Sequence, residues 1–319
     1  MSYKIATVVL GQPKSTFPEI ILKCLKMNVI KKTKIKLIFI GSEKLLNNYL
    51  KRIKKKFKIN IIEKDLFQKI DLKKNQINLI NINFNNLNSV YYIDKCFETA
   101  LNLIQSKRCN YLINGPISKS HFLKGKYPGI TEYLAKKTKT KNPVMLIYNN
   151  KVSVSPITTH IPLHKVSKEI SIKKIINNTK LIYNFYKTTL KKKPNIAITG
   201  LNPHCENFSK KNEEKNIILP AIKRLKKYNL KVYGPFPADT IFLKNNLKKY
   251  DVIVGMYHDQ VLTPLKSIFN FKAINITIGL PFIRISPDHG PNIKMYGKNK
   301  SDPTSFKEAI IFLNKLSAN

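Results

Sequence analysis

The chain has 319 residues, of which 43% are hydrophobic and 24% charged, as in ordinary globular proteins, and this length is enough for about two domains. Its formal charge is +40, from 58 lysines and arginines against 18 acidic residues, and such a charge by itself suggests nucleic-acid binding. A membrane-spanning helix and a secretory signal peptide are not expected, because the sequence contains no run of 18 uncharged apolar residues and its first ten residues lack a charged region followed by a long apolar one.

The positive charge comes almost entirely from lysine. The sequence contains 54 lysines and only 4 arginines, together with 44 isoleucines and 34 asparagines. These three abundant residue types share A/T-rich codons, so a compositional drift of the genome explains all three excesses. Selection for phosphate or base recognition favours arginine, whose planar guanidinium binds phosphates and guanine edges in a bidentate manner. We therefore interpret the charge as background and keep nucleic-acid binding as a rival hypothesis, which predicts affinity at physiological salt with a steep salt dependence.

Cysteine usage indicates the compartment. The four cysteines lie far apart and form no C-x-x-C pair, so neither a disulfide framework nor a zinc knuckle is indicated: Cys24, Cys96, Cys109 and Cys205. We therefore expect a reducing cytoplasmic location.

Short runs rich in β-branched residues alternate with longer amphipathic stretches along the chain. The runs predict strands at Ile5–Leu10, Ile35–Ile40, Tyr111–Asn114, Val144–Tyr148, Val152–Thr158, Ile196–Gly200, Val252–Gly255 and Ala273–Ile278. The amphipathic stretches predict helices, for example at Pro18–Met27, Ile93–Gln105, Ile172–Thr189, Glu213–Tyr228 and Thr304–Leu316. This alternation favours an α/β protein with a largely parallel sheet and helices on both faces.

Several segments escape the bias toward lysine, asparagine and isoleucine. They stand out because most solvent-facing positions elsewhere have drifted to these residues: Asn114–Lys119, Thr158–His164, Thr199–His204, Gly255–Lys266 and Asn275–Gly290. We expect the functional residues to lie in these segments.

Three of the six histidines lie just past the carboxyl ends of predicted strands. These are His160, His204 and His258, and each lies in one of the segments that escape the bias. In open α/β sheets ligands bind at that edge, so the three imidazoles predict a divalent-metal site with open coordination positions. Asp239 and Asp259 are candidates to orient the imidazoles or to accept protons.

Other histidines have less specific interpretations. A single loop histidine more often caps or hydrogen-bonds the backbone than binds metal, and this alternative applies to each member of the trio. Pro162 breaks the helix that would place His164 beside His160, so we interpret His164 either as a solvated residue or as one that supports a metal-binding residue. His289 fits either a turn or a pocket.

Cations and an amide near these segments suggest binding of an anionic ligand. Lys266 ends the segment that contains His258, and Arg284 follows an apolar run, so its charge needs an anionic partner. That partner is either a substrate phosphate or carboxylate, or an internal carboxylate. Asn275 can donate its amide to the same ligand. The sequence contains neither a G-x-G-x-x-G fingerprint nor a P-loop, so no cofactor-binding residues are assigned.

The segments TTHIPL, GLNPH, GPFPADT, MYHDQ and NITIGLPFIRISPDHG occur in an order and spacing that resemble the 4-hydroxythreonine-4-phosphate dehydrogenase family of pyridoxine biosynthesis. The match extends over most of the chain and is strongest from Tyr111 onward. The resemblance implies two α/β/α subdomains like those of isocitrate and isopropylmalate dehydrogenases, with the active site in the cleft between them. We expect the first subdomain to span 1–125 and 265–319, and the second, which carries the dimer contact, to span 126–264.

The resemblance also implies the reaction and the residues that perform it. A homodimer with a shared active site would oxidise 4-phosphooxy-L-threonine with NAD or NADP and decarboxylate it to 3-amino-2-oxopropyl phosphate, using one divalent metal such as Zn, Mg or Co. The family's metal ligands map onto His160, His204 and His258, in agreement with the strand-end argument. Its substrate contacts map onto Thr131, Lys266, Asn275 and Arg284, and the proton acceptor is Asp239 or Lys266.

The sequence departs from the family pattern at three places. Ile130 stands where the family has a histidine assigned to the substrate phosphate. The loops Gly11–Glu19 and Cys205–Lys210 lack glycines that the family has there. The alternative is therefore a diverged member that acts on a related phosphorylated or carboxylated 3-hydroxy acid.

Overall fold

The fold was analysed in a computed structural model that describes residues 4–27, 29–30, 32–63, 72–73, 76–84, 88–118, 122–123, 127–206 and 212–318. Lys119 and residues 207–210, which belong to segments singled out above, lie outside these residues. Within the described ranges, no helix combines the length and apolar character needed to cross a bilayer.

The chain forms two compact units, Met1–Lys139 with Leu280–Ala318, and Thr140–Gly279. These boundaries lie later in the chain than the expected ones at 125/126 and 264/265. The first boundary is later because Tyr133, in the helix that begins at Ile130, packs edge-on against Phe97 and Phe122 of unit 1. The second is later because a strand at Ile274–Ile278 pairs with Val144–Tyr148 of unit 2. Thr131 and Arg284 therefore belong to unit 1, and Lys266 and Asn275 to unit 2.

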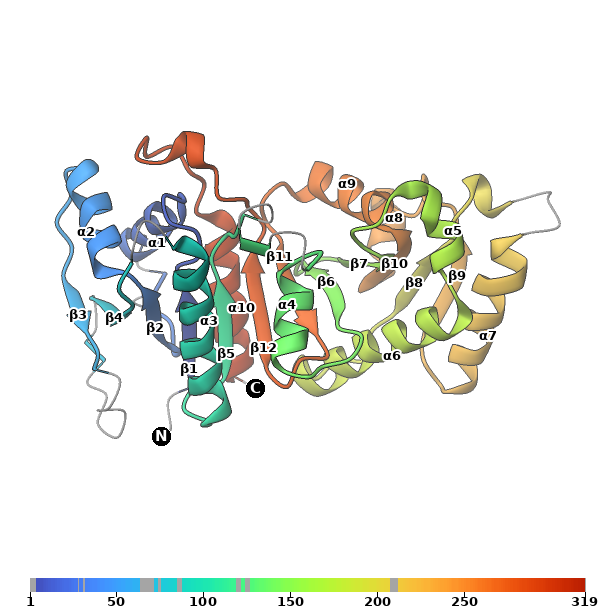
Figure 1. The fold of residues 1–319 in the computed structure, drawn as a ribbon. Coiled ribbons are helices and arrows are strands. Elements are labelled where there is room, and N and C mark those ends of the chain that lie inside the picture. Colours follow the sequence, from blue (N-terminus) through green and yellow to red (C-terminus); the bar gives the residue numbers. More distant parts are fainter. Residues whose placement is uncertain are drawn as a thin grey trace. The chain divides into compact units, whose positions relative to one another are not determined.

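Among its described residues, unit 1 has strands in the order β3-β4-β2-β1-β5-β12, and all the pairs along it are parallel. The strands are β1 (Ile5–Val9), β2 (Lys36–Gly41), β3 (Ile59–Ile61), β4 (Ile77–Asn81), β5 (Tyr111–Asn114) and β12 (Ile283–Pro287). The helices are α1 (Phe17–Lys26), α2 (Glu43–Arg52), α3 (Ser89–Gln105), α4 (Ile130–Lys137), a 3-10 turn (Ile293–Met295) and α10 (Thr304–Ala318). Helix α3 packs on β1 and β2, and α10 packs on β12 (Figure 1).

Unit 2 contains the strands in the order β11-β6-β7-β10-β8-β9. They are β6 (Val144–Tyr148), β7 (Ser153–Thr158), β8 (Ile196–Thr199), β9 (Val232–Phe236), β10 (Val252–Tyr257) and β11 (Ile274–Ile278). β6 is antiparallel to both β7 and β11, whereas β7, β10, β8 and β9 are parallel. The helical segments are the turn Leu163–Lys165, α5 (Val166–Glu169), α6 (Ile172–Thr189), the turn Pro203–Cys205, a π-helical turn (Glu214–Ile218), α7 (Leu219–Lys227), α8 (Lys244–Leu247) and α9 (His258–Phe269).

Local sequence accounts for most of these elements. Strands such as β6 and β8 are buried along their whole length, which is why they appear in the sequence as continuous apolar runs. Ser171 caps α6 by accepting a hydrogen bond from the backbone N–H of Lys174, as a serine before an amphipathic stretch predicts. The predicted strands and helices are therefore present, and the largely parallel sheet is confirmed.

Four strands and part of one helix differ from the prediction. The sequence analysis did not predict β3, β4, β9 and β12. β3 and β9 are partly exposed, and β12 contains a charged arginine. β4 is mostly buried but lies in a stretch rich in lysine and asparagine. The expected helix at Glu213–Tyr228 consists of the π-helical turn followed by α7, which has proline in its first turn. Proline has no N–H to donate into a preceding helical turn, and this favours a change of helix type at that point.

Candidate active site

The three histidines singled out from the sequence follow the carboxyl ends of three adjacent parallel strands. His160 comes two residues after β7, His204 lies in the turn that follows β8, and His258 is the first residue of α9, directly after β10. Because parallel strands end at the same edge of a sheet, this places the segments bearing the histidines along one edge of unit 2, where α/β proteins bind ligands.

Two of these imidazoles lie near each other with their planes tilted by 39°, and the third lies beside a carboxylate. The ring centroids of His160 and His258 are 6.0 Å apart. Nδ1 of His204 lies 4.0 Å from Oδ2 of Asp239, and Nδ1 of His258 lies 2.6 Å from Oδ1 of Asp259. The structure therefore places both candidate acidic partners next to members of the trio.

The metal prediction fits this arrangement only in part. Imidazole nitrogens are suitable ligands for Zn²⁺ and related ions, and the neighbouring pair lies at one sheet edge. Among the described residues, however, no group of three or more His, Cys, Asp or Glu side chains is close enough to hold a metal ion. The side chain of His204 is 74% exposed, so a change of rotamer away from Asp239 meets little steric resistance.

The turn that contains His204 has an unusual backbone. His204 and Cys205 both have positive φ, at 55° and 60°. Glycine adopts this left-handed region most readily, so two non-glycine residues there carry strain. This is the loop in which the chain lacks the glycines of the family that it resembles.

A buried carboxylate holds the start of the same loop. Oε1 of Glu214 accepts hydrogen bonds from the backbone N–H groups of Leu201 and Asn202, both at 2.8 Å, and Oε2 accepts one from the side-chain amide of Asn202 at 2.9 Å. Burial raises the pKa of Glu214, but these hydrogen bonds outweigh it, and the net pKa is lower than usual. The sequence analysis did not identify Glu214, because its partners lie on a separate loop.

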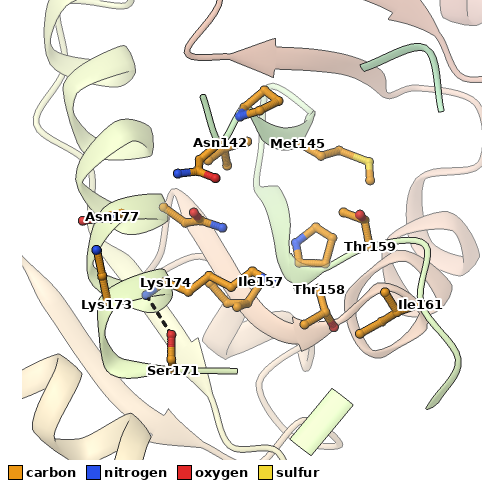
Figure 2. Close-up of a pocket in the computed structure, with 14 residues that line it drawn as sticks. Asn142, Met145, Ile157, Thr158, Thr159, Ile161, Ser171, Lys173, Lys174 and Asn177 are labelled. Atoms are coloured by element: carbon orange, nitrogen blue, oxygen red, sulfur yellow. Dashed lines mark hydrogen bonds between the residues drawn. The ribbon is translucent and has the colours of Figure 1, made fainter. Parts of the chain in front are cut away.

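A cavity of about 320 Å³ is lined in part by the sequence neighbours of His160. Its lining comes from three segments of unit 2 (Figure 2). Thr158, Thr159 and Ile161 come from the end of β7 and the loop beyond it. The start of α6 contributes Lys173 and Lys174, and the residues before and within β6 line another part. This cavity is polar on the α6 side, but none of the site residues predicted from the sequence lines it.

The two remaining predicted substrate contacts of unit 2 lie on α9 and β11. Lys266 is exposed near the end of α9. Asn275 lies within β11, and its buried Oδ1 has no hydrogen-bond partner among the described residues. A buried acceptor without a donor is costly, so Asn275 is suited to a ligand that donates a hydrogen bond.

Arg284 in β12 is 1% exposed, with partners from unit 1. Its Nε donates to Oδ1 of Asn114 at 2.7 Å, and its Nη1 donates to Oγ1 of Thr131 at 3.5 Å. Burial lowers the pKa of Arg284 to about 10, although the charge of Glu132 raises it. The structure thus brings two predicted substrate residues, Thr131 and Arg284, together within unit 1. Asn114 is the contact that the sequence analysis did not assign.

The other two histidines considered above are resolved by their surroundings. His164 is exposed in the turn after β7, as expected of a solvated residue. The ring of His289 packs 5.9 Å from that of Phe17, and burial lowers its pKa. His289 is therefore a half-buried residue of unit 1.

Comparisons with known proteins agree with the sequence resemblance. Residues 33–313 match the family profile described as pyridoxal phosphate biosynthetic protein PdxA. A 4-hydroxythreonine-4-phosphate dehydrogenase from Sulfurihydrogenibium sp. (strain YO3AOP1) is 39% identical over 318 residues, which cover 95% of each chain. A D-threonate 4-phosphate dehydrogenase from Pectobacterium atrosepticum is 35% identical over 219 residues, which cover 68% of this chain and 67% of that protein.

Solved structures support the same assignment. The crystal structure of a 4-hydroxythreonine-4-phosphate dehydrogenase from Klebsiella pneumoniae matches with a TM-score of 0.84 and 30% identity, covering 99% of this chain and 100% of that chain. An isocitrate dehydrogenase from Methylococcus capsulatus matches with a TM-score of 0.53 and 10% identity, covering 97% and 85%, and shows the fold alone. The expected dehydrogenase-like α/β fold is confirmed, and the similarity to named dehydrogenases implies a nicotinamide cofactor. The chain therefore belongs to the PdxA family of pyridoxal phosphate biosynthetic proteins, oxidoreductases whose named relatives include the 4-hydroxythreonine-4-phosphate dehydrogenases.

Proposed function

We propose that this chain is an NAD(P)-dependent 4-hydroxythreonine-4-phosphate dehydrogenase acting in pyridoxal phosphate synthesis. It oxidises the secondary hydroxyl of 4-phosphooxy-L-threonine, and the resulting keto acid loses CO₂ to give 3-amino-2-oxopropyl phosphate. The observation that carries the proposal is the row of three histidines after the adjacent parallel strands β7, β10 and β8, in a chain of this family.

The proposed metal ligands are His160, His204 and His258. When bound, a divalent cation lowers the pKa of a coordinated hydroxyl and stabilises negative charge on oxygen. Support comes from the proximity of the His160 and His258 rings and from the exposure of His204, which leaves its side chain room to change rotamer.

The other predicted residues have roles that follow from their chemistry. Asp239 or Lys266 would take the proton of the substrate hydroxyl, and a bound nicotinamide would supply the hydride acceptor for the oxidation. The later break of the C–C bond would release CO₂. Arg284 and Lys266 attract the anionic groups of the substrate, while Thr131 and Asn275 contribute hydrogen bonds. The unpartnered Oδ1 of Asn275 supports a donor on the ligand at that position.

The test is NAD(P)H formation followed at 340 nm. Purified protein is mixed with 4-phosphooxy-L-threonine, a divalent metal, and NAD⁺ or NADP⁺ in turn. We expect reduction of one cofactor with the wild-type chain, and a loss of at least about a hundredfold in His258→Ala. His164→Ala is the matched control, because that histidine is exposed, and it should keep full activity. Full activity in His258→Ala would refute the metal assignment, and no reduction under any condition would refute the proposed reaction.

The alternative is a related phosphorylated or carboxylated 3-hydroxy acid. It is favoured by the D-threonate 4-phosphate dehydrogenase among the relatives and by Ile130, which cannot bind a phosphate at a position where the family has histidine. A panel of 3-hydroxy acids, with and without a phosphate and with an amino or a hydroxyl group at C2, separates the two by comparison of kcat/KM. The homodimer, the shared site, the cytoplasmic location and the choice between Zn, Mg and Co stay predictions.

A further inference from the structure

One buried amide joins the ends of two strands that precede candidate histidines. Gln260 lies in the first turn of α9 and is 9% exposed. Its Oε1 accepts hydrogen bonds from the backbone N–H of Met256 at 2.7 Å and from the hydroxyl of Thr199 at 2.9 Å. Its Nε2 donates to the carbonyl oxygen of Gly200 at 2.8 Å. Met256 belongs to β10 and Thr199 ends β8, so the one side chain ties both strands.

The third strand, β7, is joined to the end of β10 by another buried hydrogen bond. The hydroxyl of Thr158, the last residue of β7, donates to the carbonyl oxygen of Met256 at 2.7 Å and is buried. Met256 therefore uses its carbonyl toward β7 and its N–H toward Gln260. The ends of β7, β10 and β8, which are neighbours in that order, form one continuous set of buried hydrogen bonds.

The backbone around Gln260 leaves just enough room for this amide. A Cβ added to Gly255 would lie 3.0 Å from Oε1 of Gln260 and 2.3 Å from Cγ1 of Val261. Any side chain at that position would push the first turn of α9 away from β10. Gly255 thus permits the close approach on which the hydrogen bonds of Gln260 depend.

We propose that Gln260 is a positioning residue that sets the spacing of His160, His204 and His258. His258 is two residues before Gln260, His204 is four residues after the carbonyl that Gln260 binds, and His160 is two residues after Thr158. Loss of the amide frees the strand ends to shift relative to one another, and such outer contacts typically change metal affinity by about tenfold to a hundredfold. This inference rests on the proposed function, because spacing matters only if the imidazoles act together.

Two variants remove the hydrogen bonds with little change of shape. Gln260→Met keeps the length of the side chain and removes all three bonds. Thr199→Val removes only one of them, so it still tests the inference if Gln260→Met does not fold. We expect Co²⁺ binding to the metal-free protein, measured by calorimetry, to weaken by at least about tenfold in Gln260→Met and by about fivefold in Thr199→Val.

Tyr186→Phe is the matched control. It removes the hydrogen bond from the Tyr186 hydroxyl to Oγ of Ser153 at 2.8 Å, which is also buried and lies at the opposite end of β7. It therefore removes a buried hydrogen bond from the same unit without touching the strand ends. We expect its Co²⁺ affinity to stay within twofold of wild type. An equal loss of affinity in Tyr186→Phe and Gln260→Met would overturn the inference, as would a Gln260→Met variant that binds within twofold of wild type.

His258→Ala separates failure of this inference from failure of the proposed function. If it binds Co²⁺ as tightly as wild type, or if wild type binds none, the proposed metal site is wrong. Hydrogen exchange of the amide of Leu201, which donates to Glu214 and not to Gln260, then decides the role of Gln260. Faster exchange in Gln260→Met than in Tyr186→Phe supports the positioning of the strand ends, and equal exchange in the two variants overturns it.

Discussion

Glu19 offers a direct test of the packing of unit 1. It lies in the first turn of α1 and is 1% exposed. Its Oε1 accepts hydrogen bonds from the backbone N–H of Ser301 at 2.6 Å and from Nζ of Lys23 at 3.0 Å, and its Oε2 accepts one from the hydroxyl of Tyr49 at 3.1 Å. The carboxylate therefore joins α1 to α2 and to the segment that precedes α10.

Glu19→Gln keeps the shape of the side chain but removes its charge. Hydrogen bonds to a charged group contribute about 1.5–3 kcal/mol and neutral ones about 0.5–1.5 kcal/mol, so the two bonds to Oε1 lose about 2–3 kcal/mol in total. The amide that replaces Oε2 still finds the hydroxyl oxygen of Tyr49 as an acceptor. At about 2–4 °C per kcal/mol for a unit of this size, the melting temperature should fall by roughly 5–10 °C.

The assay is urea and thermal unfolding followed by circular dichroism, with Glu98→Gln as the control. Glu98 is 40% exposed and lies 3.3 Å from Nζ of Lys95 and 3.5 Å from Nζ of Lys137. Exposed ion pairs contribute about 0–1 kcal/mol, so this control should melt close to wild type. Equal midpoints for Glu19→Gln and Glu98→Gln would refute the reasoning that the buried carboxylate acts as a charged acceptor.

Three further changes test other parts of the structure. Gly255→Ala should lower stability by about 1–3 kcal/mol, because the new methyl group lies 2.3 Å from Cγ1 of Val261; an unchanged melting temperature would contradict that close approach. Asn114→Leu should lower stability by about 1.5–3 kcal/mol, because it leaves the buried Nε–H of Arg284 without its acceptor; a urea midpoint equal to that of wild type would show that water replaces it. Since the pKa of Glu214 is lowered in the folded state from 4.5, its carboxylate stabilises the fold above that pH, and this contribution is lost as the pH falls through the lowered value. Urea midpoints of wild type and Glu214→Gln should therefore differ at pH 7 and converge in acid, and a constant difference would argue against a charged Glu214.

The candidate site could be located from the sequence because its signals are local. Each strand that precedes a histidine is a short buried run, and the histidine follows within a few residues, so the order of residues alone places it at a strand end. The segments that escaped the compositional drift pointed to the same places. Arg284 also stood out locally, as a charge beside an apolar run, but its partners did not.

The contacts between these segments depend on the tertiary structure. Asn114 binds Arg284 from 170 residues away, Ser301 binds Glu19 from 282 residues away, and Gln260 reaches Gly200 across 60 residues. No pattern along the chain pairs such positions, because each pair is brought together by the order of strands in the sheet. The sequence predicts His204 beside the other two histidines, whereas in the structure its side chain lies beside Asp239. The position of this side chain depends on its rotamer and on the conformation of the loop, and residue spacing encodes neither.

The sequence by itself determined the α/β class, the main strands and helices and the positions of the three histidines. It could do so because the spacing of apolar residues along the chain indicates which residues are buried and in which type of element. It also shows that the charge of +40 comes mostly from lysine, and the interpretation of that charge as background stays a prediction. Only the tertiary structure decided where the two units divide, that Asn114 and Thr131 contact Arg284, and how Gln260 and Thr158 together join three strand ends. These features depend on hydrogen bonds between distant segments, and such bonds form only once the sheet has fixed which strands are neighbours.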